Sequence, residues 1–239
     1  MRRRFFVDEV RNGHAHIEGE HARHLTNVLR VEVGQKYEVS DNRNVYLAEI
    51  ESARKSDVIF KTLEKMPPEP ERVRVVLYAS LVKFDHFEWM IEKTTELGVT
   101  EIVPVIAIRT ERGLDRAAEK RIERWRRIAL EASQQSRRAH LPEIADAVPF
   151  ANILETTARY RYVLDEEGGT ALAKSLPLQR SVDDSVALLV GPEGGWTDAE
   201  RSQFIAAAWT RVSMGPLILR AETAAMAAVS VISGGWLQN

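Results

Sequence analysis

An uninterrupted apolar run followed by a glycine-rich turn is the sequence feature that most constrains the fold. Residues 186–190, Val-Ala-Leu-Leu-Val, have the length of a β-strand and no polar side chain, as expected of a strand buried on both faces of a parallel sheet. The turn at residues 191–195 follows. Thr197 and Glu200 then have the spacing of a capping box, so we predict a helix that begins at Asp198. A ligand at the carboxyl end of this central strand would therefore contact the backbone of the turn directly.

The residues of this turn, Gly-Pro-Glu-Gly-Gly, exclude two common nucleotide-binding loops. A Walker loop needs Lys and then Ser or Thr after its last glycine, and the dinucleotide fingerprint needs Gly-x-Gly-x-x-Gly; neither pattern is present. The carboxylate of Glu193 would repel a pyrophosphate, but it suits ribose hydroxyls or a cationic ligand. A tight strand-to-helix turn that binds no ligand is the alternative.

A second glycine-bearing turn lies at residues 214–220. Residues 211–213 are a short strand candidate, a Gly-Pro pair ends it, and the apolar residues 217–219 fall where a loop is expected. Apolar side chains in a loop usually wall a pocket or fill a core. The alanine-rich helix that follows predicts close packing against another backbone. The alternative is a buried C-terminal helix on which Arg220 and Glu222 form a surface pair.

Five blocks of sequence, in this order and spacing, resemble the RsmE family of ribosomal RNA methyltransferases, which belongs to the SPOUT superfamily. The blocks are residues 4–7, 93–99, 134–138, 191–195 and 217–224. The resemblance covers essentially the whole chain. It implies an α/β fold with an N-terminal PUA-like β-barrel and a C-terminal SPOUT methyltransferase domain, whose final helix threads a deep trefoil knot. Sequence pattern alone predicts an ordinary doubly wound sheet, since knots are nearly absent from proteins.

The resemblance also implies an activity. A homodimer would transfer the methyl group of S-adenosyl-L-methionine to N3 of one uridine in 16S ribosomal RNA, within the small ribosomal subunit. The catalytic residue is expected to be Arg220, and no dedicated general base is visible, with Glu193 and Glu222 only as candidates. The expected cofactor-binding residues are Leu164, Gly191, Pro192, Glu193, Gly194, Gly195, Met214, Gly215, Leu217, Ile218, Leu219, Glu222, Thr223 and Ala224. The alternatives are a ribose 2′-O-methyltransferase of the same superfamily and a non-catalytic RNA-binding assembly factor.

Residues 1–67 are expected to form the PUA-like RNA-binding barrel, because short strand patterns recur there with turns between them. The strand candidates are residues 5–7, 16–18, 36–40, 45–50 and 57–60. One short helix is predicted at residues 20–30, with Leu25, Val28 and Leu29 on its buried face.

Two histidines of this helix, His21 and His24, could lie on one face at a spacing that suits a metal ion. Catalytic and structural zinc sites usually add carboxylate or thiolate ligands in a recognisable set, and no such set accompanies this pair. We therefore expect no bound metal.

A proline-rich acidic segment at residues 66–71 marks the predicted domain boundary, because such a segment is extended and semi-rigid. Strand and helix patterns alternate over residues 73–239, which predicts an α/β domain with its ligand site at the carboxyl ends of the strands. The turns after Leu164, Val190 and Met214 are expected to meet there.

Two helices of this domain are predicted from their composition. Residues 84–97 form the first, with Gly98 just beyond its end. A long, strongly basic helix is expected from residue 116 to about residue 138.

Basic residues in both domains are expected to contact RNA. A solvated surface is the ordinary role of charges at a chain end or along a helix, and the resemblance is what favours RNA binding for the first domain. The end of the long basic helix also offers donors suited to phosphates and base edges. The expected RNA-binding residues are Arg2, Arg3, Arg4, Arg23, His24, Arg30, Lys83, Arg137 and Arg138.

Composition limits the remaining possibilities. A net charge of −2 gives no overall attraction to nucleic acid, so RNA binding must come from local clusters of basic residues. The absence of cysteine excludes disulfides, thiolate nucleophiles and Cys-ligated zinc. The basic start of the chain lacks an apolar core of signal-peptide length and no window approaches a membrane span, so we expect a cytoplasmic protein that does not bind membranes.

Overall fold

The computed structural model describes residues 3–237 and divides the chain into two compact units. The first unit comprises Met1–Pro70 together with Ser133–Leu141, and the second comprises Glu71–Ala132 and Pro142–Asn239. The segment Ser133–Leu141 is the part that the sequence analysis did not expect in the first unit.

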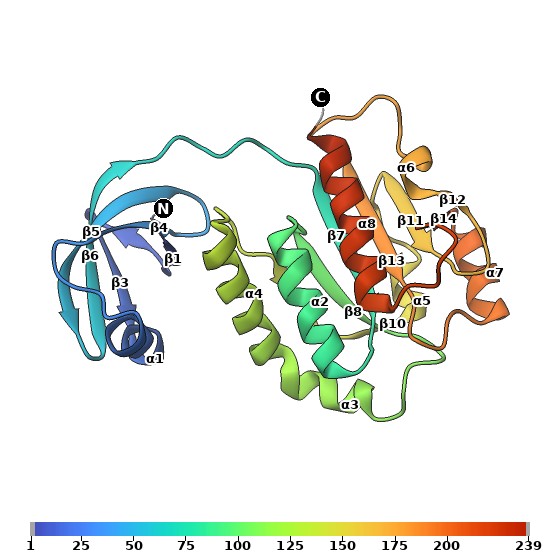
Figure 1. Cartoon of the computed structure of the whole chain (residues 1–239), viewed down its shortest axis with the longest axis horizontal. Helices are drawn as coiled ribbons and strands as arrows, with labels where there is room; N and C mark the ends of the chain where they lie inside the picture. The colour runs from blue at the N-terminus through green and yellow to red at the C-terminus, as the bar shows by residue number, and fades with distance from the viewer. Residues whose placement is uncertain (1–2, 238–239) are drawn as a thin grey trace. The chain divides into compact units, whose positions relative to one another are not determined.

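The first unit is built on a six-stranded sheet in the order β1-β4-β5-β6-β3-β2, with antiparallel pairing except between β1 and β4 (Figure 1). Its strands are β1 (Arg4–Phe6), β2 (Val10–Arg11), β3 (His14–Glu18), β4 (Lys36–Ser40), β5 (Val45–Arg54) and β6 (Asp57–Lys65). Phe5, Val39, Ile50 and Phe60 are fully buried between the strands. The alternation of buried and exposed residues along β3 is that of a strand with one face in the core.

The predicted short helix of this unit is interrupted. The α-helix α1 (Gly19–Arg23) continues as the π-helix η1 (His24–Val28), in which the amide of Leu29 donates to the carbonyl of His24 at 3.1 Å. A π-turn holds an extra residue, which rotates the positions after it around the helix axis. Leu25 is therefore buried as predicted, whereas Val28 is 63% exposed and the prediction of a buried Val28 was wrong.

Polar contacts attach the segment Ser133–Leu141 to this unit. The hydroxyl of Ser40 donates to the carbonyl of Ala139 at 2.6 Å, and the amide of Leu141 donates to Oδ1 of Asn42 at 2.7 Å. These partners are about a hundred residues apart in the chain, so no local sequence pattern could have predicted their contacts.

The second unit contains a parallel sheet in the order β10-β8-β7-β13-β11-β14-β12, with β9 also paired to β8. Its strands are β7 (Arg74–Ser80), β8 (Glu101–Ile106), β9 (Glu143–Ile144), β10 (Val148–Pro149), β11 (Tyr160–Leu164), β12 (Thr170–Ala171), β13 (Ser185–Val190) and β14 (Thr210–Ser213). The apolar run at residues 186–190 lies in β13, between β7 and β11, so its prediction as a central strand is confirmed.

Both faces of this central strand are covered, which explains why it has no polar residue after Ser185. Val186, Leu188 and Val190 belong to one apolar core, and Ala187 and Leu189 belong to another on the opposite face. Side chains alternate between the two faces of a strand, so a doubly covered strand must be apolar at every position.

Helices cover the two faces of the sheet, with α2, α4 and α8 on one side (Figure 1). The helices of the unit are α2 (Phe84–Glu96), α3 (Leu114–Ala118), the 3-10 helix η2 (Glu119–Arg121), α4 (Ile122–Ser136), α5 (Phe150–Ile153), α6 (Leu172–Ser175), α7 (Asp198–Ala206) and α8 (Ala221–Trp236). The α5 and α7 side chains Phe150 and Phe204 pack in the other core.

Three helix predictions can be compared with these bounds. The capping box is confirmed, because Thr197 Oγ1 accepts from the amide of Glu200 and α7 begins at Asp198. Gly98 follows the end of α2 with a φ of +99°, as a C-terminal glycine requires. The continuous helix expected at 116–138 is instead α3, η2 and α4, since a tightened 3-10 turn separates the two α-helices.

The small residues of α8 pack inside the unit. Ala225 and Ala228 are fully buried in the same core as Phe87 and Ile91 of α2. This internal contact fits the close packing against another backbone that the small-residue composition predicts. Threading of α8 through a knot stays a prediction. Among residues 3–237, no helix has the combined length and apolarity that a bilayer crossing demands.

Candidate functional site

A pocket of about 520 Å³ lies at the carboxyl ends of β11, β13 and β14. These three strands are neighbours in a parallel sheet, so their carboxyl ends share one edge. The turns that follow Leu164, Val190 and Met214 all contribute to its lining, together with the start of α8. The expected meeting of these turns is therefore found in the structure.

The indole of Trp196 organises the first glycine turn. Its Nε1 donates to the carbonyl of Leu164 at 2.9 Å, and the ring is fully buried. A Cβ added at Gly191 would lie 3.0 Å from Cε2 of this ring. Glycine at position 191 thus lets the backbone pass directly against the indole.

The far end of the same turn also needs glycine. Gly195 has a φ of +69°, which side-chain-bearing residues rarely adopt, and a Cβ there would collide with the carboxylate of Glu166. Arg109 holds the turn from the loop after β8, because its Nη1 donates to the carbonyl of Gly194 at 2.8 Å. Arg109 was not predicted, and an exposed loop arginine gave no signal in the sequence.

The second turn contributes apolar side chains to the pocket, and the rest of the turn does not bury them. Leu217 is 76% exposed and Ile218 is 88% exposed, and both line the pocket. The hydroxyl of Ser213 accepts from the amide of Gly215 at 3.1 Å, which closes the turn at the end of β14. Such exposed apolar side chains at a concave site suit a partly apolar ligand.

Most of the residues expected to bind the cofactor line this pocket. They are Leu164, Gly191, Pro192, Glu193, Gly194, Gly195, Met214, Gly215, Leu217, Ile218, Leu219 and Ala224. Glu222 and Thr223 do not. Ala221 and Ala224, three residues apart, turn toward the pocket, and each helical residue is rotated by about 100° from the one before it. Glu222 therefore points elsewhere, with Oε1 3.7 Å from Nδ1 of His86, while Thr223 is exposed to solvent.

The turn after β11 was expected at the site, but its acidic residues were not named as site residues. Asp165 is buried, accepts from Nε of Arg211 at 2.7 Å and from Nε of Arg201 at 3.3 Å, and lines the pocket beside Glu166. Burial alone would lower the pKa of Arg201, but the charges of Asp165, Glu167 and Glu166 raise it above its ordinary value. This network joins the turn after β11 to Arg201 of α7 and Arg211 of β14 beside the pocket, and the acidic run at a strand end was its only trace in the sequence.

Arg220, the expected catalytic residue, is the N-cap of α8 and lines the pocket with an exposed side chain. Within the described part of the chain, its guanidinium has no hydrogen bond or ion pair. The group is therefore available to a ligand in the pocket.

Two of the expected RNA-binding arginines have structural partners. Arg4 is 5% exposed, and its Nε donates to Oε2 of Glu38 at 3.0 Å. Arg137 also pairs with Glu38, through Nη2. The burial of Arg4 and its pair with Glu38 favour a structural role for this side chain over contact with a phosphate.

The other basic residues differ in exposure and position. Arg3, Arg23, His24, Arg30 and Lys83 are exposed, and Arg138 donates from Nε to the carbonyl of His140 at 3.1 Å. Arg2 lies outside the described residues. The exposed residues therefore keep RNA contact open as a role.

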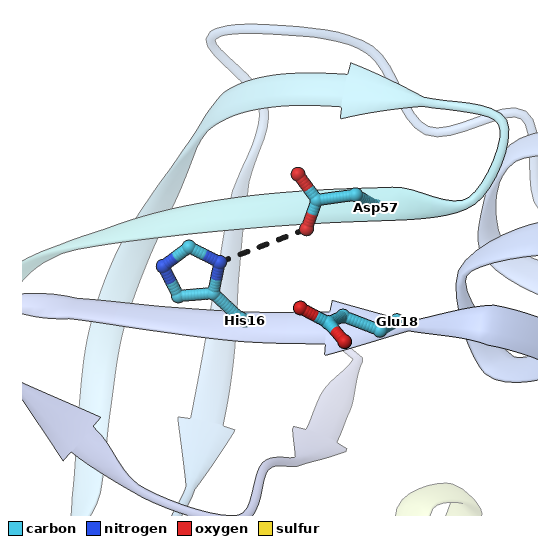
Figure 2. Close-up of side chains that lie close together, drawn as sticks. All are labelled: His16, Glu18 and Asp57. Carbon is cyan, nitrogen blue, oxygen red and sulfur yellow. Dashed lines mark ion pairs between the residues drawn. The ribbon is translucent and has the colours of Figure 1, made fainter.

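A small polar cluster in the first unit joins the strands β3 and β6 (Figure 2). His16, Glu18 and Asp57 offer ligand atoms within 4.8 Å of one another, and Nδ1 of His16 lies 3.6 Å from Oδ1 of Asp57. His16 and Glu18 are exposed, and exposed groups of this kind commonly bind no ion. We therefore assign the cluster no part in the chemistry of the pocket.

Comparison with known families agrees with both units. The RNA methyltransferase domain family matches residues 69–233, and the RNA methyltransferase PUA domain family matches residues 17–63. The chain is 33% identical over 231 residues to the ribosomal RNA small subunit methyltransferase E of Bacillus subtilis, covering 91% of this chain and 88% of that protein. It is 33% identical over 215 residues to the protein of the same name from Synechocystis, covering 88% and 69%.

Solved structures share the whole fold. The ribosomal RNA small subunit methyltransferase E of Neisseria gonorrhoeae, bound to S-adenosyl methionine, has a TM-score of 0.88 at 27% identity and covers 99% of this chain and 98% of that one. A putative methyltransferase of Legionella pneumophila, also in complex with this cofactor, has a TM-score of 0.89 at 26% identity and covers 98% of each chain. The N-terminal unit is thus a PUA-like sheet and the second unit a parallel α/β methyltransferase domain, and the chain belongs to the RsmE family of ribosomal RNA small subunit methyltransferases.

Proposed function

We propose that this protein transfers the methyl group of S-adenosyl-L-methionine to N3 of a uridine in 16S ribosomal RNA, within the small ribosomal subunit. The observation that carries the proposal is the pocket at the ends of β11, β13 and β14, in a chain whose fold matches two relatives solved with this cofactor. The substrate would place the enzyme in the cytoplasm.

The residues of the pocket fit the cofactor. Its volume of about 520 Å³ is in the range of small-molecule sites. Leu217, Leu219 and Ala224 would wall the adenine, and backbone groups of Gly191 and Gly194 would bond its polar edges. When bound, the cofactor supplies an electrophilic methyl group on a positively charged sulfur. The carboxylates of Glu166 and Glu193 at the pocket suit the ribose hydroxyls and the cationic end of such a ligand.

Arg220 would act on the methyl acceptor. The N3 proton of uridine ionises roughly two pH units above neutrality, so forming the nucleophilic anion costs roughly 3 kcal/mol. A cation that meets the uracil carbonyl oxygens or an adjacent phosphate lowers this cost. The guanidinium of Arg220 lines the pocket and is exposed, which supports this role.

The remaining proposals concern RNA binding and assembly. Residues 1–67 would form the RNA-holding domain and residues 73–239 the catalytic one, with the exposed Arg23, His24 and Arg30 as contacts to the phosphate backbone. A homodimer would cover the exposed apolar side chains of Leu217 and Ile218 beside the pocket. Sedimentation analysis of the purified protein tests the dimer.

A labelled-methyl experiment tests the proposed activity. Small ribosomal subunits from cells that lack this methylation are incubated with the protein and S-adenosyl-L-methionine labelled in its methyl group. Label is expected in 16S RNA and not in large-subunit RNA. Cofactor binding without transfer to subunits or to free RNA would favour a non-catalytic assembly factor.

A further inference from the structure

Glu222 and His86 form a contact outside the pocket lining that the proposed mechanism does not use. The Glu222 side chain is only 2% exposed, and its Oε1 lies 3.7 Å from Nδ1 of His86. The other oxygen, Oε2, is fully buried and has no hydrogen-bond partner within the described residues. A buried carboxylate is costly unless a cation or hydrogen-bond donors compensate it, and the ring nitrogen Nδ1 of His86 lies against this one.

The position of His86 supports this pairing. His86 lies in the first turn of α2 (Phe84–Glu96), where the helix dipole disfavours a positive charge. Two carboxylates offset this effect: Asp85 on the same helix, 3.8 Å from Nε2, and Glu222 on α8. Asp85 is 77% exposed and therefore screened by water, so the buried Glu222 is the stronger partner.

The contact lies at the α8 end of the second pocket turn. Gly215, Pro216, Leu217 and Ile218 are all exposed, so the turn has little apolar packing of its own. Its position depends on the end of β14 and on the first turn of α8. That first turn includes Glu222 and also carries Ala221 and Ala224 into the pocket lining.

We propose that His86 is a positioning residue that, through Glu222, ties the first turn of α8 to the start of α2. The tie keeps Arg220 and the turn at residues 214–219 in the arrangement that binds the cofactor. This inference rests on the proposed function, because the affinity for S-adenosyl-L-methionine is what reports the tie.

A double-mutant cycle tests the proposal. The variants are His86→Ala, Glu222→Gln, the double variant and His86→Lys, with His21→Ala as a control at an exposed histidine of the first unit. Calorimetry gives the dissociation constant for S-adenosyl-L-methionine, methyl-transfer assays separate KM for the cofactor from kcat, and thermal unfolding shows that each variant is folded.

The tie predicts a particular pattern of affinities. His86→Ala removes the side chain that contacts the buried carboxylate and so breaks the tie, and it should raise the dissociation constant and KM by about fivefold or more. Glu222→Gln should raise both constants as His86→Ala does, and the double variant should bind no more weakly than either single variant, because the tie is already lost. His86→Lys should bind the cofactor within about twofold of the wild type. His21→Ala should change neither constant.

Other outcomes would overturn the inference. Wild-type affinity in His86→Ala means that the pair positions nothing, and losses that add up in the double variant mean that the two side chains do not act through each other. If His86→Ala does not fold, the comparison of His86→Lys with His86→Gln decides in the same way, since only lysine places a cation beside the carboxylate of Glu222. A wild-type protein that binds no cofactor would instead refute the proposed function, so the two failures are distinct.

Discussion

The indole nitrogen of Trp196 donates a hydrogen bond of 2.9 Å to the carbonyl oxygen of Leu164, and this bond joins the ends of β13 and β11 at the pocket. Two strand ends that must present their turns to one ligand are thereby held at a fixed separation. The bond is buried, so water cannot replace it.

Replacing Trp196 by Phe should therefore weaken both the fold and the site. The substitution leaves the carbonyl of Leu164 without its partner and opens a space in the core, and we expect a loss of about 1–3 kcal/mol in unfolding free energy together with weaker cofactor binding. Urea denaturation and calorimetry measure the two effects. Trp89→Phe is the matched control, because Trp89 is 47% exposed; equal effects of the two substitutions would contradict the account.

Gly195→Ala should impair cofactor binding more than folding. The left-handed backbone, with a φ of +69°, strains any side chain, and the new methyl group would displace the carboxylate of Glu166 from the pocket rim. We expect at least a tenfold rise in the dissociation constant, on the order of 1.4 kcal/mol. Gly234→Ala serves as the control because a Cβ there meets nothing within 4 Å. Wild-type affinity for the cofactor in Gly195→Ala would show that this turn does not contribute to cofactor binding.

Arg220→Ala should lower turnover and largely spare cofactor affinity. An arginine that stabilises charge on the acceptor acts in the transition state, so kcat should fall by roughly a hundredfold or more with little change in KM for the cofactor. Steady-state methyl-transfer kinetics measure both constants. Arg112, exposed in the same unit, provides the control substitution Arg112→Ala; a variant at position 220 that keeps its turnover would exclude Arg220 from catalysis.

Asp184 should make stability depend on pH. Burial alone would raise its pKa, but hydrogen bonds from Ser181 and Trp236 and the charge of Arg159 lower it below the ordinary value. Because the folded-state pKa is the lower one, the stabilisation is present above the pKa of the unfolded chain, about 3.9, and is lost as the pH falls through the folded value.

The matching substitution is Asp184→Asn. It should cost about 1–3 kcal/mol at pH 7, and the difference from the wild type should shrink as the pH falls below about 4. Urea denaturation at several pH values measures this difference, with the exposed Asp183→Asn as control. A difference that stays constant from pH 7 to pH 3 would show that the carboxylate charge contributes nothing.

Truncation of Arg23 should weaken RNA binding, whereas truncation of Arg4 should lower the stability of the fold. Arg23→Ala removes an exposed charge, so binding to the small subunit should weaken at low salt and the salt dependence should fall by about one phosphate contact, with stability unchanged. Arg4→Ala breaks the buried pair with Glu38 and should cost roughly 3 kcal/mol of stability. Filter binding at several salt concentrations and thermal unfolding separate the two, and a stable Arg4→Ala protein with impaired RNA binding would reverse our assignment.

Local patterns were enough to predict the elements that build the pocket. The apolar β13, the capping box of Thr197 and Glu200, and Gly98 after α2 each depend on residues within a few positions of one another. Parallel strands bring their carboxyl ends to one edge, so the meeting of the three turns followed from the order of the elements.

The structure departs from the expected positions where the outcome depends on distant partners or on a small rotation. Arg4 was taken for an RNA contact because Glu38, its buried partner, lies far along the chain. Glu222 was expected in the pocket, but its place on α8 turns it toward His86. Val28 was expected to be buried, and one π-turn rotates it out to solvent. Sequence spacing assumes a regular helix and therefore could not show the π-turn before Val28.

The identity of the methylated nucleoside tests the central claim most directly. Small subunits that lack the modification are treated with the protein and methyl-labelled S-adenosyl-L-methionine, and the 16S RNA is digested to nucleosides and separated. The account predicts label in 3-methyluridine. Label in a ribose-methylated nucleoside would keep the fold and the cofactor site but contradict the proposed chemistry at N3 and the role given to Arg220.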